Sequence, residues 1–242
     1  MTYQNILITG GSGKVGRKLL VSDLSKRTII APTSKEMDIT NSKQVLNYFK
    51  KHKIDAVIHC AAFTDLKKCA RNPQKAIEAN IVGTSNIVNA VLKKNARMIY
   101  ISTDYVYPGT KGPYSEEDKT IPFTAYGWTK LGGECAVRTL KNYCILRTSF
   151  FEPENIHFDT APSDAFFSKI PLQELIQAIK FLLDSKFIGV INVGQKRASM
   201  YHILKKHKTS MKAISIEDLP SSRAKDSSLE IKLWEKVKRK KA

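Results

Sequence analysis

The sequence has few of the features that mark secreted, membrane-spanning or metal-binding chains. Only four of its 242 residues are cysteine, and no two of them form a C-x-x-C pair. We therefore expect reduced thiols in a reducing compartment and no metal site. No run approaches the ~18 apolar residues of a membrane span. The N-terminus lacks the basic segment and long apolar segment of a secretion signal, so we expect a cytoplasmic protein with no membrane segment.

Acidic residues are also scarce. The chain has 22 Asp and Glu against 40 Lys and Arg, a net charge of +18. From Lys196 onward there are 14 Lys and Arg against five Asp and Glu, and the chain ends in a basic tail, LWEKVKRKKA. No nucleic-acid motif accompanies this charge, so a nucleic-acid partner is disfavoured. A basic surface suits a doubly anionic small substrate, and a lysine-rich solvated surface is the simplest interpretation.

Short apolar runs alternate with helical patterns along most of the chain. Strands are predicted at 5–10, 27–32, 55–62, 97–103, 143–149 and 189–194. Helices are predicted at 14–24, 41–53, 73–95, 125–142, 171–185 and 200–208. This alternation predicts an α/β fold, a Rossmann-type doubly wound parallel sheet with a small, shortened C-terminal substrate lobe. We expect residues 1–150 to form an NAD(P)-binding domain. Residues 151–242 would form the reduced lobe, interleaved with the first domain, and the basic tail.

A glycine-rich loop follows the first predicted strand. Gly10, Gly13 and Gly16 in TGGSGKVG are spaced G-x-x-G-x-x-G, and a helix follows at once. The first glycine allows a tight turn, the second lets the backbone approach a pyrophosphate, and the third lets helix and strand pack closely. The helix N-terminus then favours the anion. The loop therefore predicts dinucleotide binding.

The tip of the second strand bears on the choice of cofactor. An acidic residue there would hold the ribose 2′-hydroxyl of NAD, but the stretch from Ala31 to Lys35 contains no acid, and the first one after the strand is Glu36. Lys35, with Lys14 and Arg17, could meet a 2′-phosphate, which favours NADPH, with NADH as the alternative. Asp38 and Ile39 would suit the adenine end, or Asp38 would simply cap the next helix.

Tyr-x-x-x-Lys occurs three times, and this spacing brings two side chains together only on a helix. Tyr107/Lys111 encloses Pro108 and Gly109 and is predicted to be loop. Tyr201/Lys205 lies in the lysine-dense region and is predicted to be a solvated helix surface. Tyr126/Lys130 opens the helix that follows the fourth strand.

That fourth strand ends in Ser102-Thr103-Asp104, at the edge of the sheet where ligands bind in such folds. Thr103, Tyr126 and Lys130 are therefore the predicted catalytic residues. We expect the Lys130 ammonium to lower the pKa of the Tyr126 phenol. The phenol could then protonate an oxygen while hydride reaches its carbon, and Thr103 could hydrogen-bond the same oxygen.

Together these residues resemble the extended short-chain dehydrogenase/reductase family, and within it most closely the dTDP-4-dehydrorhamnose reductase-like sugar-nucleotide reductases. The resemblance covers roughly residues 4–151. It rests on TGGSGKVG, DIT at 38–40, HCAAFTDLKKC at 59–69, ISTDYVYPG at 101–109, AYGWTKLGGE at 125–134 and LRTS at 146–149.

The resemblance implies NAD(P)H-dependent reduction of the 4-keto group of a nucleoside-diphosphate 4-keto-6-deoxy sugar, in deoxysugar biosynthesis. It implies substrate contacts from Thr103, Asp104, Phe150 and Arg223. It also implies that a homodimer could form through the helices at 73–95 and 125–142. The implied cofactor contacts are Gly10, Gly13, Lys14, Val15, Gly16, Lys35, Asp38, Ile39, Cys60, Ala61, Ala62, Thr64, Tyr126 and Lys130.

Two departures from the family pattern keep alternatives open. Leu66-Lys67-Lys68 stands where these reductases usually have V-D-K, and the stretch 151–169 is much shorter than their substrate region. A third departure argues against a combined epimerase–reductase, because relatives that also epimerise carry a cysteine where this chain has Tyr105. The alternatives are an epimerase or dehydratase of the same superfamily, with Asp104 as its acid, and a non-catalytic NADP-binding regulatory subunit.

Overall fold

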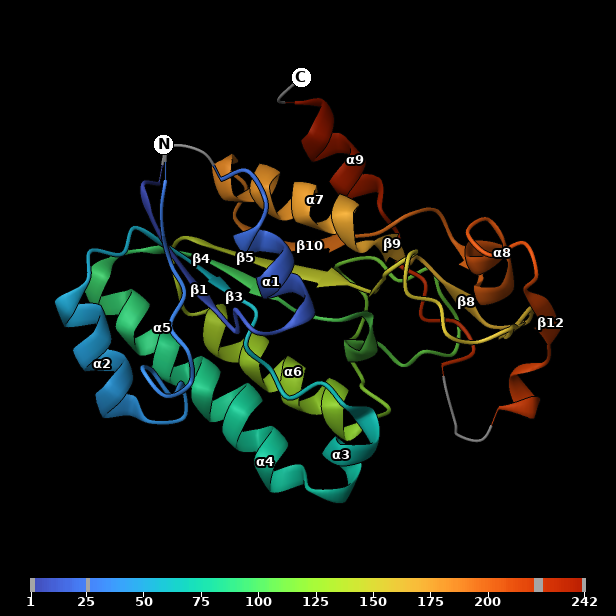
Figure 1. Cartoon of the computed structure of the whole chain (residues 1–242), viewed down its shortest axis with the longest axis horizontal. Coiled ribbons are helices and arrows are strands. Elements are labelled where there is room, and N and C mark those ends of the chain that lie inside the picture. The colour runs from blue at the N-terminus through green and yellow to red at the C-terminus, as the bar shows by residue number, and fades with distance from the viewer. Residues whose placement is uncertain (1–2, 25–26, 220–223, 241–242) are drawn as a thin grey trace.

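The structure is a computed structural model that describes residues 3–24, 27–219 and 224–240. Its centre is a six-stranded sheet in the order β10-β5-β4-β3-β1-β2 (Figure 1). All pairings within this sheet are parallel. The strands are β1 (Asn5–Thr9), β2 (Thr28–Ile30), β3 (Ala56–His59), β4 (Arg97–Ile101), β5 (Tyr143–Thr148) and β10 (Gly189–Val193). The predicted Rossmann-type α/β fold and all six predicted strands are confirmed.

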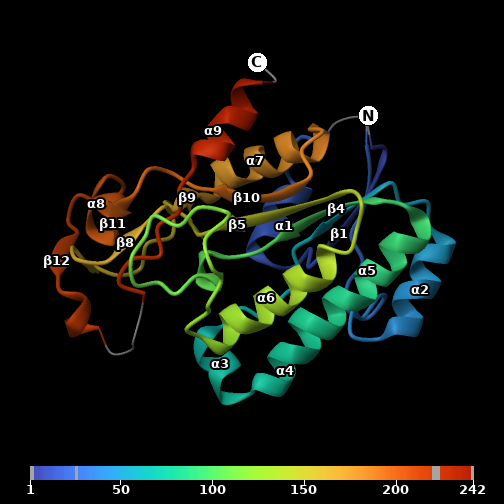
Figure 2. The ribbon, with the colours of Figure 1, turned by 180° about the vertical axis from the view of Figure 1, so that it is seen from behind.

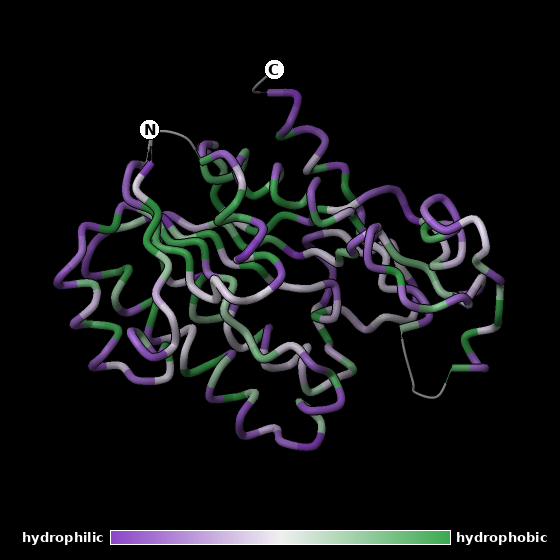
Figure 3. Tube along the Cα trace, viewed as in Figure 1, coloured by the Kyte–Doolittle hydropathy of each residue, from purple (hydrophilic) through white to green (hydrophobic). Residues whose placement is uncertain are grey.

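Helices cover both faces of this sheet, as Figures 1 and 2 show from opposite sides. One face packs on α1 (Lys14–Leu20), α7 (Leu172–Asp184) and α9 (Lys232–Arg239). The other packs on α2 (Ser42–Lys51), α5 (Gly83–Lys94) and α6 (Ala125–Val137). Apolar residues gather along the central strands, and polar ones gather on the outer helix surfaces (Figure 3). Burial of both sheet faces explains why the strand sequences are continuous apolar runs.

The predicted helix at 73–95 is divided in the structure. Pro73–Ile77 forms α4, Glu78–Val82 is a π-helical turn, η1, and Gly83 begins α5. Pro73 sits at the first position, where its missing N–H is no loss, and Asn72 caps the end by accepting from the Lys75 N–H. The π turn packs against α6, which carries the predicted catalytic pair. Helix α3 (Leu66–Arg71) precedes α4 and was not predicted from the sequence.

The residues beyond β5 combine sheet-bound and separate elements. Strand β10 completes the main sheet, and helix α7 packs on one face of it. The other strands of this region are short and pair apart from the main sheet. A small apolar cluster of their own includes Ala161, Phe167, Ile203 and Met211. The short elements are β6 (Phe150–Phe151), β7 (Thr160–Pro162), β8 (Phe166–Phe167), β9 (Ile170–Pro171), β11 (Ala198–Ser199), α8 (Met200–Lys205), β12 (Lys212–Ile214) and η3 (Ile216–Asp218). The division at residue 150 stays a prediction.

The basic tail has a structure that composition did not predict. Residues Lys232–Arg239 form α9, whose Trp234 is buried against Phe181 of α7, with the rings 5.6 Å apart edge to face. The basic residues of α9 are exposed: Lys232, Lys236, Lys238 and Arg239. The tail is thus a packed amphipathic helix with a cationic outer surface.

Candidate active site

The order of the strands creates a crevice next to β1. The chain passes from β1 to β2 on one side and later returns to β3 on the other. Ligands in open α/β sheets bind at such a switch, outside the carboxyl ends of the strands. Gly10 follows β1 and Cys60 follows β3, so both lie at this point.

The glycine loop is built as its spacing predicts. Gly10 has φ +69°, and a Cβ there would come 2.6 Å from the Ala61 nitrogen. A Cβ on Gly16 would come 2.2 Å from the Gly10 oxygen, so both positions require glycine. Gly13 is the N-cap residue of helix α1, which has no side-chain cap and no acid in its first turn. The loop therefore offers an open, electropositive cradle that fits a pyrophosphate.

A cleft of about 330 Å³ runs from this loop to the end of β4. It brings together the glycine loop and the three predicted catalytic residues, although they lie up to 120 residues apart in the chain. Its lining comprises Gly10, Gly13, Lys14, Val15, Gly16, Cys60, Ala62, Thr64, Leu66, Ile101, Ser102, Thr103, Asp104, Tyr105, Tyr126, Lys130, Thr148, Ser149, Phe150 and Lys169.

Thr103 and Asp104 form a buried polar pair in this cleft. The Thr103 hydroxyl donates to Asp104 Oδ1 at 3.0 Å, and Ser227 donates to Asp104 Oδ2 at 2.7 Å. Burial raises the pKa of Asp104, while Lys169 and these hydrogen bonds lower it. Ser227 ties the late part of the chain to the end of β4, a contact that no sequence motif indicates.

Tyr126 does not have the lowered pKa that we expected. Burial and the Asp104 carboxylate raise the pKa of its phenol, and a hydrogen bond with Thr103 lowers it only in part. Lys130 is 2% exposed, and burial lowers its own pKa to about 7. Its ammonium lies 4.0 Å from the centre of the Tyr100 ring. Our prediction for Tyr126 was wrong because it counted the neighbouring cation and left out the desolvation of both groups.

Some predicted contacts lie outside the cleft lining. Lys35 is exposed, and Asp38 accepts from both the N–H and the hydroxyl of Thr40 at 2.9 Å, a local turn. Ile39 packs against Gly83. Ala61 meets the glycine loop through its backbone. Arg223 lies outside the described residues.

The tip of the second strand has a feature that bears on the cofactor. Glu36 turns back onto Thr33, accepting from its N–H at 2.7 Å and its hydroxyl at 2.9 Å. The first acid after the strand is therefore engaged locally, and Lys35 beside it is solvent-exposed.

The cleft residues that were not predicted include Thr148, Ser149 and Lys169. Lys169 donates to the Ser149 hydroxyl at 2.9 Å, and its charge acts on Asp104. The Thr148 hydroxyl is buried and has no hydrogen-bond partner. LRTS marked the strand end that carries Thr148 and Ser149, but Lys169 comes from an irregular stretch with no pattern to indicate it.

The two other Tyr–Lys pairs do not line this cleft. Tyr107 is fully buried and donates to the Ser115 carbonyl oxygen at 2.7 Å, within a non-helical loop. Tyr201 and Lys205 share α8, with the ammonium 5.9 Å from the ring centre. The loop at Tyr107 and the helix at Tyr201 are confirmed, but Tyr201 and Lys205 are half-buried rather than fully solvated, because Tyr201 packs on a small apolar cluster and Lys205 donates to backbone carbonyl oxygens.

Comparison with known families decides the membership of this chain. Residues 4–155 match the family described as the RmlD substrate binding domain. The chain belongs to this family. It is 39% identical over 151 residues to a dTDP-4-dehydrorhamnose reductase of Mycolicibacterium smegmatis, a match that covers 61% of this chain and 46% of that protein. A dTDP-4-dehydrorhamnose reductase of Aggregatibacter actinomycetemcomitans is 34% identical over 149 residues, covering 60% and 51%. The match thus spans about half the length of these relatives.

Solved structures of the family resemble the fold over nearly its whole length. A dTDP-4-dehydrorhamnose reductase of Clostridium acetobutylicum has a TM-score of 0.89 at 28% identity, covering 97% of this chain and 93% of that one. The Bacillus anthracis enzyme, solved in complex with NADP, has a TM-score of 0.87 at 26% identity, covering 97% and 92%. In the described part of the chain, no helix has the length and apolar character needed to cross a membrane.

Proposed function

We propose that this chain is an NADPH-dependent reductase of the 4-keto group of a nucleoside-diphosphate 4-keto-6-deoxy sugar, acting in cytoplasmic deoxysugar biosynthesis. The observation that carries the proposal is one cleft containing a dinucleotide-type glycine loop together with Thr103, Tyr126 and Lys130. The names of the relatives at 34–39% identity support the substrate class.

The residues of the cleft suit carbonyl reduction. When bound, NADPH supplies hydride to the carbonyl carbon. The Tyr126 phenol donates a proton to the carbonyl oxygen, and Thr103 hydrogen-bonds that oxygen as negative charge develops on it. Lys130 stabilises the phenolate that remains, which matters because burial and Asp104 both favour the neutral phenol. Asp104 and Phe150 would contact the sugar nucleotide from the walls, and we retain Arg223 as a proposed substrate contact.

The dinucleotide would lie along the glycine loop. Gly10, Gly13 and Gly16 would admit its pyrophosphate, with Lys14 and Val15 at the helix start. Cys60, Ala61, Ala62 and Thr64 would border the nicotinamide half. Lys35 would meet the 2′-phosphate, and Asp38 and Ile39 the adenine.

The deciding experiment is incubation with NADPH and a panel of nucleoside-diphosphate 4-keto-6-deoxy sugars, with loss of the nicotinamide absorbance followed. Tyr126→Phe should abolish turnover and leave NADPH affinity nearly unchanged. Equal activity in that variant would remove Tyr126 from the mechanism. NADPH binding without oxidation by any sugar would favour a non-catalytic subunit, and redox-neutral conversion would favour an epimerase or dehydratase.

The cofactor preference has its own test. We propose tighter binding of NADPH than of NADH, and a Lys35→Ala variant should lose most of that difference. The charge-matched control is Lys43→Ala, on the exposed surface of α2. Equal affinities in the unmodified protein would rule out a 2′-phosphate contact.

We also propose a homodimer through α4, η1, α5 and α6, which pack on one another. Apolar side chains are exposed on these elements at Ile77 (44%), Val82 (43%) and Trp128 (53%). Analytical ultracentrifugation should give a dimer that Trp128→Glu converts to a monomer. A monomeric unmodified chain at micromolar concentration would contradict this.

A further inference from the structure

We propose that Glu134 is a positioning residue of this site, one that fixes Thr103 and Lys130 relative to each other and supports the positive charge of Lys130. The role in turnover rests on the proposed reductase function. The charge of Lys130 and the placement of Thr103 are properties of the protein that can be measured without turnover.

Glu134 connects the three elements that carry the cleft. It lies on α6 and is completely buried. Its Oε1 accepts from the Ser102 hydroxyl at 2.6 Å, and Ser102 immediately precedes Thr103 at the end of β4. The Arg147 guanidinium, on β5, donates to Glu134 Oε1 from Nε at 3.0 Å and to Oε2 from a terminal nitrogen at 2.7 Å. One carboxylate thus joins β4, β5 and α6.

The hydrogen bonds of the Glu134–Arg147 pair continue into the loop that contains Tyr107 and Ser115. Arg147 donates to the Tyr107 hydroxyl at 2.7 Å, and that hydroxyl donates to the Ser115 carbonyl oxygen at 2.7 Å. Both charged groups are almost fully excluded from water, at 1% exposure for Arg147 and none for Glu134. Apolar side chains of similar volume often serve stability as well as a buried ion pair does. Stability alone therefore does not explain the Glu134–Arg147 ion pair. The pair lies directly behind the cleft and is bonded to Ser102 of its wall, which points to a role in the site.

The second part of the role concerns charge. Glu134 follows Lys130 by four residues on α6, so their side chains share one side of the helix. Burial lowers the pKa of Lys130 to about 7, and the Glu134 carboxylate acts against that effect. The other groups facing Lys130 are the Cys60 thiol, the imidazole of His59 and the Tyr100 ring.

None of those other groups is a strong source of negative charge at neutral pH. Burial and Lys130 lower the pKa of His59 to about 3, so its imidazole is neutral, and burial raises the pKa of Cys60 to about 12. Tyr126, one turn before Lys130, is held neutral by burial. Glu134 is therefore the anion that raises the cationic fraction of Lys130, whose pKa of about 7 leaves it about half charged at pH 7.

The experiment separates placement from charge with two variants. Ser102→Ala removes the link to β4 and leaves the ion pair intact. Glu134→Gln with Arg147→Met removes both charges together, which avoids leaving a buried guanidinium unpaired. The titration of Lys130 is followed in full-length protein by NMR of the lysine ε-carbon, with the signal assigned by Lys130→Arg. NADPH affinity, kcat, KM and thermal stability are measured alongside.

We expect the double variant to lower the pKa of Lys130 by about one unit or more, and to move the alkaline limb of the kcat profile down by the same amount. Ser102→Ala should lower kcat about tenfold, with NADPH affinity and the pKa of Lys130 unchanged. Glu134→Asp with Arg147 retained should restore the pKa toward its original value.

A folded double variant with an unchanged pKa of Lys130 would overturn the charge role, whatever the turnover result. Unchanged kcat in Ser102→Ala would overturn the placement role. A kcat loss that follows only thermal stability across the variants would make Glu134 structural alone. If no sugar nucleotide is reduced by the unmodified protein, the proposed function fails while the pKa measurement still decides the charge role.

Discussion

At the residue scale, the site is defined by polar groups that the fold holds away from water. His59 at the end of β3 is completely buried, with Nδ1 2.6 Å from the Thr9 hydroxyl and Nε2 3.1 Å from the Thr84 hydroxyl. These partners accommodate a neutral imidazole. Protonating it would place a second charge near Lys130.

His59 therefore predicts loss of stability in mild acid. Burial, helped by Lys130, lowers the pKa of His59 from 6.5 to about 3. Below pH 6.5 His59 binds a proton in the unfolded chain but stays neutral in the folded chain. The free energy of unfolding therefore falls as the pH falls, by about 1.4 kcal/mol per pH unit. The stability contribution of neutral His59 is fully present above pH 6.5 and is lost progressively toward pH 3.

The measurement is urea unfolding at pH 7.5, 6 and 5, with His59→Gln beside the unmodified protein. Between pH 7.5 and 5 the unmodified protein should lose about 2 kcal/mol more than the variant. Parallel pH dependences in the two proteins would show that His59 titrates normally in the folded state.

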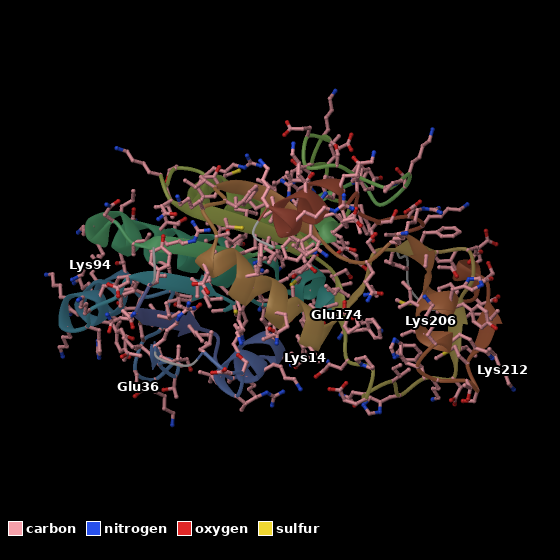
Figure 4. The ribbon with its side chains drawn as sticks, turned by 90° about the horizontal axis from the view of Figure 1, so that it is seen from above. Lys14, Glu36, Lys94, Glu174, Lys206 and Lys212 are labelled. Atoms are coloured by element: carbon pink, nitrogen blue, oxygen red, sulfur yellow. The ribbon has the colours of Figure 1, made fainter. Side chains whose placement is uncertain are left out.

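A second prediction at this scale concerns Lys14, which Figure 4 labels on α1 at the glycine loop. It forms an ion pair with Glu152 across the mouth of the cleft, and this pair lowers the pKa of Glu152. A cofactor pyrophosphate would compete with that carboxylate for the same ammonium. Glu152→Gln should therefore tighten NADPH binding by up to about fivefold, since exposed pairs are worth about 1 kcal/mol or less.

Isothermal titration with NADPH at low salt measures this effect. The matched control is Glu154→Gln, the same charge change at an exposed position two residues away. Equal gains in both variants would indicate a general effect of net charge, and weaker binding in Glu152→Gln would show that Glu152 assists the cofactor.

At the scale of single elements, α6 determines where Tyr126 and Lys130 lie, and its two adjacent glycines differ in what surrounds them. A Cβ on Gly133 would come 2.3 Å from the Tyr100 hydroxyl and 2.8 Å from the Asn80 carbonyl oxygen. A Cβ on Gly132 would meet only the Ile81 side chain, at 2.7 Å. The Ile81 side chain can rotate, whereas the backbone oxygen cannot move alone.

Gly133→Ala should therefore destabilise the protein by about 1–3 kcal/mol and lower activity, because α6 must move away from β4. Gly132→Ala should keep activity and match or exceed the original melting temperature, since alanine favours a helix over glycine. Thermal unfolding and NADPH oxidation rates check both. Comparable losses in the two variants would mean that helix geometry, not this contact, is limiting.

Patterns within single elements account for how much the sequence could predict. Short apolar runs identified all the main strands, and TGGSGKVG located the cofactor crevice because its glycines serve local geometry. The pairing of β7 with β12 joins residues some 50 apart through three-residue strands, which leave no periodicity. Desolvation of Tyr126 depends equally on distant packing, which is why the sign of its pKa shift could not be predicted.

At the scale of the whole molecule, the chain has a net charge of +18, and helix α9 shows how basic segments take part in packing. One side of this helix is buried, while its lysines and arginine stay exposed. The many lysines of this segment gave no indication that one side of the helix is buried. Trp234 is 5% exposed and packs on α7, and Leu233 and Val237 pack against the same core. Lys94, Lys206 and Lys212, labelled in Figure 4, are likewise exposed on elements whose other sides are packed. Part of the excess charge thus lies on the outer surfaces of elements that the fold requires.

This arrangement predicts that the basic tail matters for its tryptophan more than for its charge. Trp234→Ala removes the ring that packs edge to face on Phe181 and should destabilise the protein by about 3 kcal/mol. Lys236→Gln with Arg239→Gln removes two exposed charges from the same helix and should change stability by about 0.5 kcal/mol or less. Urea unfolding of both variants makes the comparison. A larger loss in the charge variant, or none in Trp234→Ala, would mean that α9 is not part of the folded core and that its cations serve a partner.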